Sequence, residues 1–330
     1  MKKLISLLVA TLVLTLAVGC GKADAKKTDS SSKELSVVTT IFPEYDWVKQ
    51  IVGDTREADI TMLLDNGVDL HSYQPSADDI IKISDCDVFI YVGGESDEWV
   101  DDVLKEATNK DMVVINLLET LGNRIKEEEV VEGMQGEEEE EEEEHGDAEE
   151  GPEYDEHVWL SLKNSSVLVQ SIADGIAKAD PDNKDAYEKN AAAYIKQLEE
   201  LDAKYEDAVA NAGTKTLLFG DRFPFRYLVD DYKLDYYAAF VGCSAETEAS
   251  FETITFLSKK VDELGLKNIM QIESADGKIA QTIIDNTKDK NQTVLTLDSM
   301  QSVTAQHVAD GANYLAIMEK NLEILKQALQ

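Results

Sequence analysis

Two of the four histidines in the chain stand in segments whose residue types could bind a metal ion. His71 lies in the loop Gly-Val-Asp-Leu-His-Ser-Tyr-Gln-Pro, after a predicted strand at 59–64, and His157 begins His-Val-Trp-Leu-Ser. Asp298 directly follows another predicted strand, at 293–297. Open α/β sheets place ligands at the carboxyl ends of their strands. Two imidazoles and a carboxylate suit Zn²⁺, and Mn²⁺ is the alternative because carboxylate oxygens favour the harder ion.

The two other histidines are weaker candidates. His145 stands within a run of glutamates, where it is either a transient ligand or a solvated residue. His307 is interpreted as a structural or capping residue near the last predicted helix. A single loop histidine such as His71 is usually an ordinary surface residue, so the metal hypothesis depends on the rest of the chain.

An acidic segment leads directly into His157. Residues 127–156 include 18 acidic residues and no Lys or Arg. One interpretation is a self-repelling, disordered loop that serves solubility. The other is a loop that gathers cations for an ordered ligand. The gathering residues would be Glu137, Glu138, Glu139, Glu140, Glu141, Glu142, Glu143, Glu144 and His145.

The net charge and the N-terminal segment of the chain limit the kinds of partner that it can bind. The formal net charge of −36 argues against nucleic acid and against anionic lipid surfaces, because both require a basic footprint. Residues 1–19 have the pattern of a secretory signal, and residues 20–34 read as a flexible tether. Cys20 follows Ala-Val-Gly, which predicts a lipid anchor; ordinary secretion is the alternative. We therefore expect an extracytoplasmic protein that touches the membrane through this anchor only, with Cys86 and Cys243 able to form one disulfide.

Alternating strand and helix patterns predict an α/β fold with two lobes, each a mainly parallel sheet flanked by helices. The predicted boundaries are 35–180 for the first lobe and 213–330 for the second. Between them, residues 181–212 show the longest helical pattern, with Asp180 as the expected N-cap and Pro181 in the first turn. Such a helix joins the lobes, or packs within one domain. The last helix is expected near 309–330.

Several segments together resemble the solute-binding lipoproteins of metal-uptake ABC transporters, the zinc- and manganese-binding cluster A-I. The first-lobe segments are 37–43, 71–75, 87–94 with Trp99, and 157–161; the second-lobe segments are 246–250, 273–274, 298–299 and 314–322. The resemblance implies a monomeric receptor, not an enzyme. It would capture a divalent cation, zinc before manganese, between two lobes joined by a rigid helix, and deliver it to the ABC permease and its ATPase.

The resemblance also implies four metal ligands. His71, His157 and Asp298 match three of them, whereas the remaining position, a His or Glu in the family, holds Arg222. A guanidinium stays protonated and cannot bind a metal. Asp221, slightly favoured over Cys243, or water would then fill the place; Arg222 would pair with Asp298 or hold an anion.

Two other classes of function use the same residues. A zinc hydrolase would hold the ion with His71, His157 and Asp298 around an open position, but the sequence has no His-Glu-x-x-His pattern and no obvious general base. A surface adhesin or metallochaperone on the same scaffold is the other alternative.

Overall fold

The computed structural model describes residues 34–136, 153–244 and 248–330, and residues 34–330 form one compact unit. The predicted signal segment, Cys20, all of the tether except Glu34, and the run Glu137–Glu144 with His145 lie outside the described residues. None of the helices in the described part combines the length and apolar character needed to cross a bilayer.

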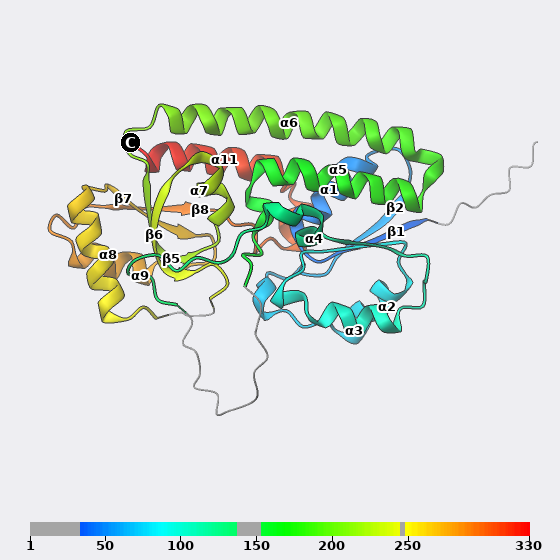
Figure 1. The fold of residues 1–330 in the computed structure, drawn as a ribbon, viewed down its shortest axis with the longest axis horizontal. Helices are drawn as coiled ribbons and strands as arrows, with labels where there is room; N and C mark the ends of the chain where they lie inside the picture. Colours follow the sequence, from blue (N-terminus) through cyan, green and yellow to red (C-terminus); the bar gives the residue numbers. More distant parts are fainter. Residues whose placement is uncertain (1–33, 137–152, 245–247) are drawn as a thin grey trace, which may run out of the picture. The chain divides into compact units, whose positions relative to one another are not determined.

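The first sheet contains four parallel strands in the order β2-β1-β3-β4 (Figure 1). The strands are β1 (Leu35–Thr39), β2 (Ala58–Met62), β3 (Val88–Tyr91) and β4 (Val113–Asn116). Helices α1 (Phe42–Val52) and α5 (Leu162–Ala179) cover one face, and α2 (Ala77–Asp85) and α3 (Trp99–Glu106) lie on the other; α4 (Leu117–Leu121) follows β4. All four residues of β3 are buried, as expected for a parallel strand covered on both faces.

The second sheet also has four parallel strands, in the order β6-β5-β7-β8. They are β5 (Thr216–Phe223), β6 (Asp235–Val241), β7 (Asn268–Ile272) and β8 (Thr293–Leu297). Leu217 and Phe219 belong to one apolar cluster and Leu218 to another, so side chains alternate between two buried faces. Helices α8 (Phe251–Leu264) and α9 (Lys278–Asn286) pack in the second cluster. Helices α7 (Arg226–Tyr232) and α11 (Tyr314–Ala328) pack in the first.

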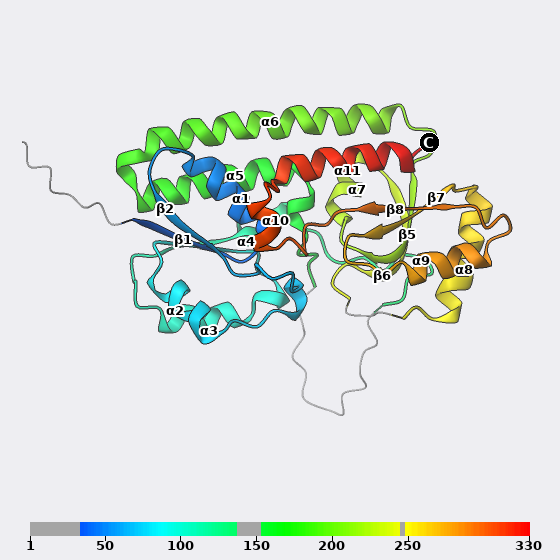
Figure 2. The same ribbon diagram turned by 180° about the vertical axis from the view of Figure 1, so that it is seen from behind.

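Helix α6 (Lys184–Ala210) joins the two lobes (Figures 1 and 2). Its 27 residues correspond to about 40 Å, and it packs on α1 and α5 at one end and on α11 towards the other. A buried stripe at three- and four-residue spacing confirms the predicted period: Tyr187, Ala191, Tyr194, Leu198, Leu201, Tyr205 and Val209. The predicted fold class is therefore confirmed, whereas the lobe boundaries stay a prediction.

Two helix boundaries differ from those expected from the sequence: the start of α6 and the start of the last helix. Pro181–Asn183 form a 3₁₀ turn before α6, and Asp180 does not cap the helix; its carboxylate accepts hydrogen bonds from Tyr187 and Asn183 and pairs with Arg56. The last helix, expected from residue 309, begins at Tyr314 as α11, because the chain turns at Gly311 with a φ of 96°. A separate short helix, α10 (Ala305–Ala309), precedes this turn.

Residues 126–135, here called the strap, run from the first lobe to the edge of the second sheet. The backbone N–H of Gln135 donates to the carbonyl of Ala239 (2.9 Å), and Gln135 bridges to Phe240 on β6. An antiparallel bridge joins Glu127 to Tyr154. The strap therefore covers an open edge of strand β6. The bridges at Gln135 and Tyr154 hold the described residues on either side of positions 137–152.

Candidate metal centre

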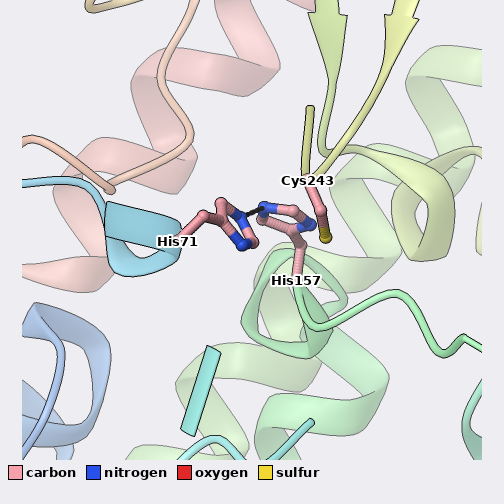
Figure 3. A group of neighbouring side chains, drawn as sticks. All are labelled: His71, His157 and Cys243. Atoms are coloured by element: carbon pink, nitrogen blue, oxygen red, sulfur yellow. Dashed lines mark hydrogen bonds between the residues drawn. The ribbon is translucent and has the colours of Figure 1, made fainter. Parts of the chain in front are cut away.

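His71 and His157 face each other through their Nε2 atoms, which lie 3.3 Å apart (Figure 3). The side chain of His157 is 0% exposed and that of His71 12%. Two nitrogen ligands of one tetrahedral zinc ion lie about 3.3–3.4 Å apart when each Zn–N distance is about 2.0–2.1 Å. The separation therefore fits the two imidazoles as ligands of a single ion.

Each imidazole is oriented by an acceptor on its other nitrogen. Nδ1 of His157 lies 3.1 Å from Oδ1 of Asp155, and Nδ1 of His71 lies 2.8 Å from the Ser96 hydroxyl. Metal-binding histidines ordinarily donate their second N–H in this way, which fixes the tautomer and ring orientation. The arrangement leaves the Nε2 atoms available to an ion.

The local sequence explains how both rings are placed. Asp69 caps the 3₁₀ turn Leu70–Ser72 by accepting the backbone N–H of His71 (3.1 Å). Asp155 accepts the backbone N–H of His157 in the same way (2.9 Å). Both histidine segments thus contain the pattern Asp-x-His, which is the one signal in the sequence that could have identified Asp69 and Asp155. No comparable pattern marks Ser96.

The protonation states of the two histidines differ. Burial, together with the neighbouring His157, lowers the pKa of His71 to about 3. Burial also opposes protonation of His157, but the charge and hydrogen bond of Asp155, together with the charge of Glu156, outweigh it and raise the pKa of that imidazole. His71 therefore presents a neutral nitrogen at neutral pH, whereas a metal must displace a proton from part of the His157 population.

Cys243 is the third group within reach. Among the described residues, His71, His157 and Cys243 form the one group of three or more metal-ligating residue types whose ligand atoms all lie within 4.8 Å of one another. Figure 3 shows the His157 imidazole between the His71 imidazole and the Cys243 thiol. Burial and the Asp155 carboxylate raise the pKa of the thiol well above its usual value. A bound cation would reverse this effect, because a coordinating thiol is deprotonated.

The disulfide that Cys86 and Cys243 could have formed is not present. Cys86 is buried in the core of the first lobe, where its sulfur lies 3.4 Å from that of Met112. Cys243 stands just after β6 and keeps its thiol. The thiol is therefore available to the site.

The two aspartates expected at the site have other partners. Asp298 follows β8 as predicted, and its Oδ1 accepts the backbone N–H of Met300 (2.9 Å); burial and the nearby Glu273 raise its pKa to about 6. It is outside the group formed by the two histidines and Cys243. Asp221 uses both carboxylate oxygens to accept backbone N–H groups, of Arg222 (2.9 Å) and Ile272 (3.0 Å). Rotating Asp221 towards a metal would break both bonds.

Arg222 forms an ion pair with Asp69, not with Asp298. Its guanidinium extends from β5 in the second lobe to the turn that carries His71 in the first. The expectation that Arg222 pairs with Asp298 is therefore wrong. Arg222 instead connects the two lobes beside the candidate metal centre.

Two parallel-sheet lobes on a long helix, with an imidazole pair at their junction, define the class of two-lobed solute-binding proteins. A family model described as zinc-uptake complex component A, periplasmic (ZnuA), matches residues 37–328, and the chain belongs to this family. The resemblance inferred from the motifs is thus confirmed. The description of the family names a component of a zinc-uptake complex, and the hydrolase alternative finds no support in it.

Individual proteins are similar over nearly the whole chain. The zinc-binding lipoprotein AdcA of Streptococcus pneumoniae (strain R6) is 34% identical over 327 residues, covering 99% of this chain but 61% of AdcA. The chain thus spans about three-fifths of the length of that relative. The high-affinity zinc uptake system protein ZnuA of Bacillus subtilis is 32% identical, with 99% of this chain and 98% of ZnuA covered. The zinc-bound ZnuA-like domain of S. pneumoniae AdcA has a TM-score of 0.69 at 31% identity, with 90% and 99% of the two chains covered.

Proposed function

We propose that this chain is an extracytoplasmic receptor that captures one Zn²⁺ ion and delivers it to an ABC permease driven by its ATPase. The observation that carries the proposal is the pair of buried imidazoles whose Nε2 atoms face each other at 3.3 Å. Zinc is favoured over manganese because imidazole nitrogen and thiolate sulfur are softer ligands than carboxylate oxygen. The zinc-bound relative supports the same ion.

His71 and His157 are the two ligands for which the geometry argues most directly. We assign Cys243 as the third, because its sulfur lies within 4.8 Å of both imidazoles. Asp298 remains a proposed carboxylate ligand on the family resemblance. Asp221 is not proposed, because its carboxylate connects β5 to β7.

The N-terminal segment and the charge of the chain support the setting that we propose for the receptor. Cys20 would carry the lipid anchor, residues 20–34 the tether, and 35–180, 181–212 and 213–330 the two lobes with their linking helix. The lipoprotein description of AdcA supports the anchor. Glu137–Glu144 and His145 would raise the local cation concentration. The receptor would act as a monomer without nucleic-acid partners.

Capture in this receptor would involve only small movements of the lobes. The indole N–H of Trp159 in the first lobe donates to the carbonyl of Ser299 in the second (2.9 Å), and Asn66 bridges to Thr304. Arg222 adds its ion pair with Asp69. These contacts hold the ligands near their final positions, so the ion's main tasks are to shed water and to displace protons from His157 and Cys243.

Isothermal titration of the metal-stripped chain with Zn²⁺ tests the proposal. His71→Ala and His157→Ala should each weaken binding more than about 100-fold, since removing a ligand costs more than the 10–100-fold loss typical of its hydrogen-bonding partners. His307→Ala is the matched control, because His307 is an exposed histidine that caps α10. Unchanged zinc affinity in both site variants would refute the assignment.

A further inference from the structure

A cavity of about 280 Å³ opens beside the candidate metal centre, and four of its eight lining residues are glutamates. Its walls include four glutamates, Glu95, Glu128, Glu153 and Glu156, together with His71 and Cys243. None of the described residues that line it is Lys or Arg. The cavity therefore concentrates negative charge and borders two of the three proposed zinc ligands.

Glu156 separates this cavity from an ordinary acidic surface. The residue is only 2% exposed, and its Oε1 accepts the backbone N–H of Ser96 (2.9 Å). Its Oε2 is buried and accepts no hydrogen bond from any described group, although it lies 3.4 Å from Nδ1 of His71. That nitrogen already contacts the Ser96 hydroxyl. A buried carboxylate oxygen without a donor is costly unless a cation or water compensates it.

The cavity has room for a cation that keeps its water. Six water molecules occupy about 180 Å³ at about 30 Å³ each, less than the volume of the cavity. Hard divalent ions prefer carboxylate oxygen and retain part of their hydration shell. Glu128 is already held in place, because its Oε1 accepts the backbone N–H of Cys243 (3.1 Å).

We propose that this glutamate cavity is a second, outer cation site, which binds a hydrated divalent ion through carboxylate oxygens next to the His71–His157 centre. On delivery, zinc passes through this outer site before it loses its water to the two imidazoles. The role in delivery rests on the proposed function. Cation binding by the cavity itself does not.

The test uses Mn²⁺ as a probe of the outer site in the chain lacking its first 20 residues, already loaded with one equivalent of Zn²⁺. Electron paramagnetic resonance counts bound Mn²⁺ in the parent chain, in Glu128→Gln/Glu153→Gln, and in Glu57→Gln/Glu199→Gln. The last pair removes the same charge from exposed glutamates outside the cavity. We expect the parent and the control pair to bind one more Mn²⁺ than Glu128→Gln/Glu153→Gln. Equal Mn²⁺ stoichiometry in all three would overturn the outer site.

Stopped-flow measurement of zinc uptake by the same three proteins tests the role in delivery. Glu128→Gln/Glu153→Gln should take up zinc about twofold to tenfold more slowly than the control pair, as expected for reduced electrostatic steering. Retained tight zinc binding would show that this variant folds. Equal uptake rates would overturn the delivery role, whereas a parent chain without tight zinc binding would overturn the proposed function and not the outer site.

Discussion

An aspartate two residues earlier in the chain holds each histidine of the metal centre. Asp69 contacts only the backbone N–H of His71 and shares its carboxylate with Arg222, whereas Asp155 contacts both the backbone and the ring of His157. Hydrogen bonding to a carboxylate raises the basicity of a metal-binding imidazole. His157 is therefore expected to be the stronger ligand and His71 the one that exchanges more readily.

The assignment of Cys243 as a zinc ligand gives a prediction for this single residue. Co²⁺ replaces Zn²⁺ in tetrahedral sites and absorbs strongly when a thiolate coordinates it, so the Co²⁺-loaded chain should show a thiolate-to-metal band. Cys243→Ser should abolish this band and weaken zinc binding by about tenfold or more. If the band persists in Cys243→Ser, it must come from another thiol, such as that of Cys86. Unchanged spectrum and affinity would remove Cys243 from the site.

At the level of elements, the turn after β6 brings Cys243 close to His157 because residue 242 is glycine. A Cβ atom at Gly242 would lie 2.9 Å from the carbonyl oxygen of Phe223 and 3.1 Å from Cε1 of His157. The backbone of the second lobe thus approaches the imidazole as closely as contact allows. The close approach of residue 242 to His157 is therefore needed for packing as well as for metal binding.

Gly242→Ala should therefore disturb the metal centre without removing a ligand. We expect about tenfold weaker zinc binding, because the imidazole must move from its position against Asp155, and a loss of about 1–3 kcal/mol in the free energy of unfolding. Zinc titration and urea denaturation measure the two effects. Gly213→Ala is the control, since the nearest atom to its Cβ would be 3.5 Å away. Equal behaviour of the two variants would contradict the argument.

The strongly patterned elements were predictable from the sequence, and the partners across the lobes were not. The apolar stripe of α6 follows from local rules and is confirmed. The ion pair between Arg222 and Asp69 joins residues 153 positions apart, and no local pattern announces it. The strap was missed for the same reason, because a single bridge such as Gln135 to Phe240 leaves no period.

For the whole molecule, two carboxylates buried in the first lobe couple stability to pH. Glu44 is 0% exposed and Asp97 3% exposed, and each has one carboxylate oxygen without a hydrogen bond among the described residues. Burial and the charge of Asp97 raise the pKa of Glu44, and burial raises that of Asp97 to about 7. In the folded state both groups keep their proton to a higher pH than in the unfolded chain, which releases it near pH 4.

Stability should consequently fall as the pH rises from about 4 towards the pKa of Asp97, about 7, by up to about 1.4 kcal/mol per pH unit from Asp97 alone. The raised pKa of Glu44 acts in the same direction. Asp97→Asn should remove the Asp97 part, so the metal-free variant should melt higher than the parent at pH 8 and close to it at pH 4. Thermal melts at the two pH values check this. The control is Asp101→Asn, an exposed aspartate on α3. A stability difference that does not change with pH would contradict the assignment.

The strap has a practical consequence for engineering. Gln135 is held to β6, and the backbone of Glu153 is held to that of Glu128, so residues 135 and 153 both lie on anchored backbone. A fluorescent protein inserted between them would start and end on anchored backbone, with one anchor on the second lobe and the other, Glu153, lining the cavity beside the candidate metal centre. Any shift of the lobes on loading would then strain the insert and change its emission, which would make this receptor a genetically encoded zinc sensor.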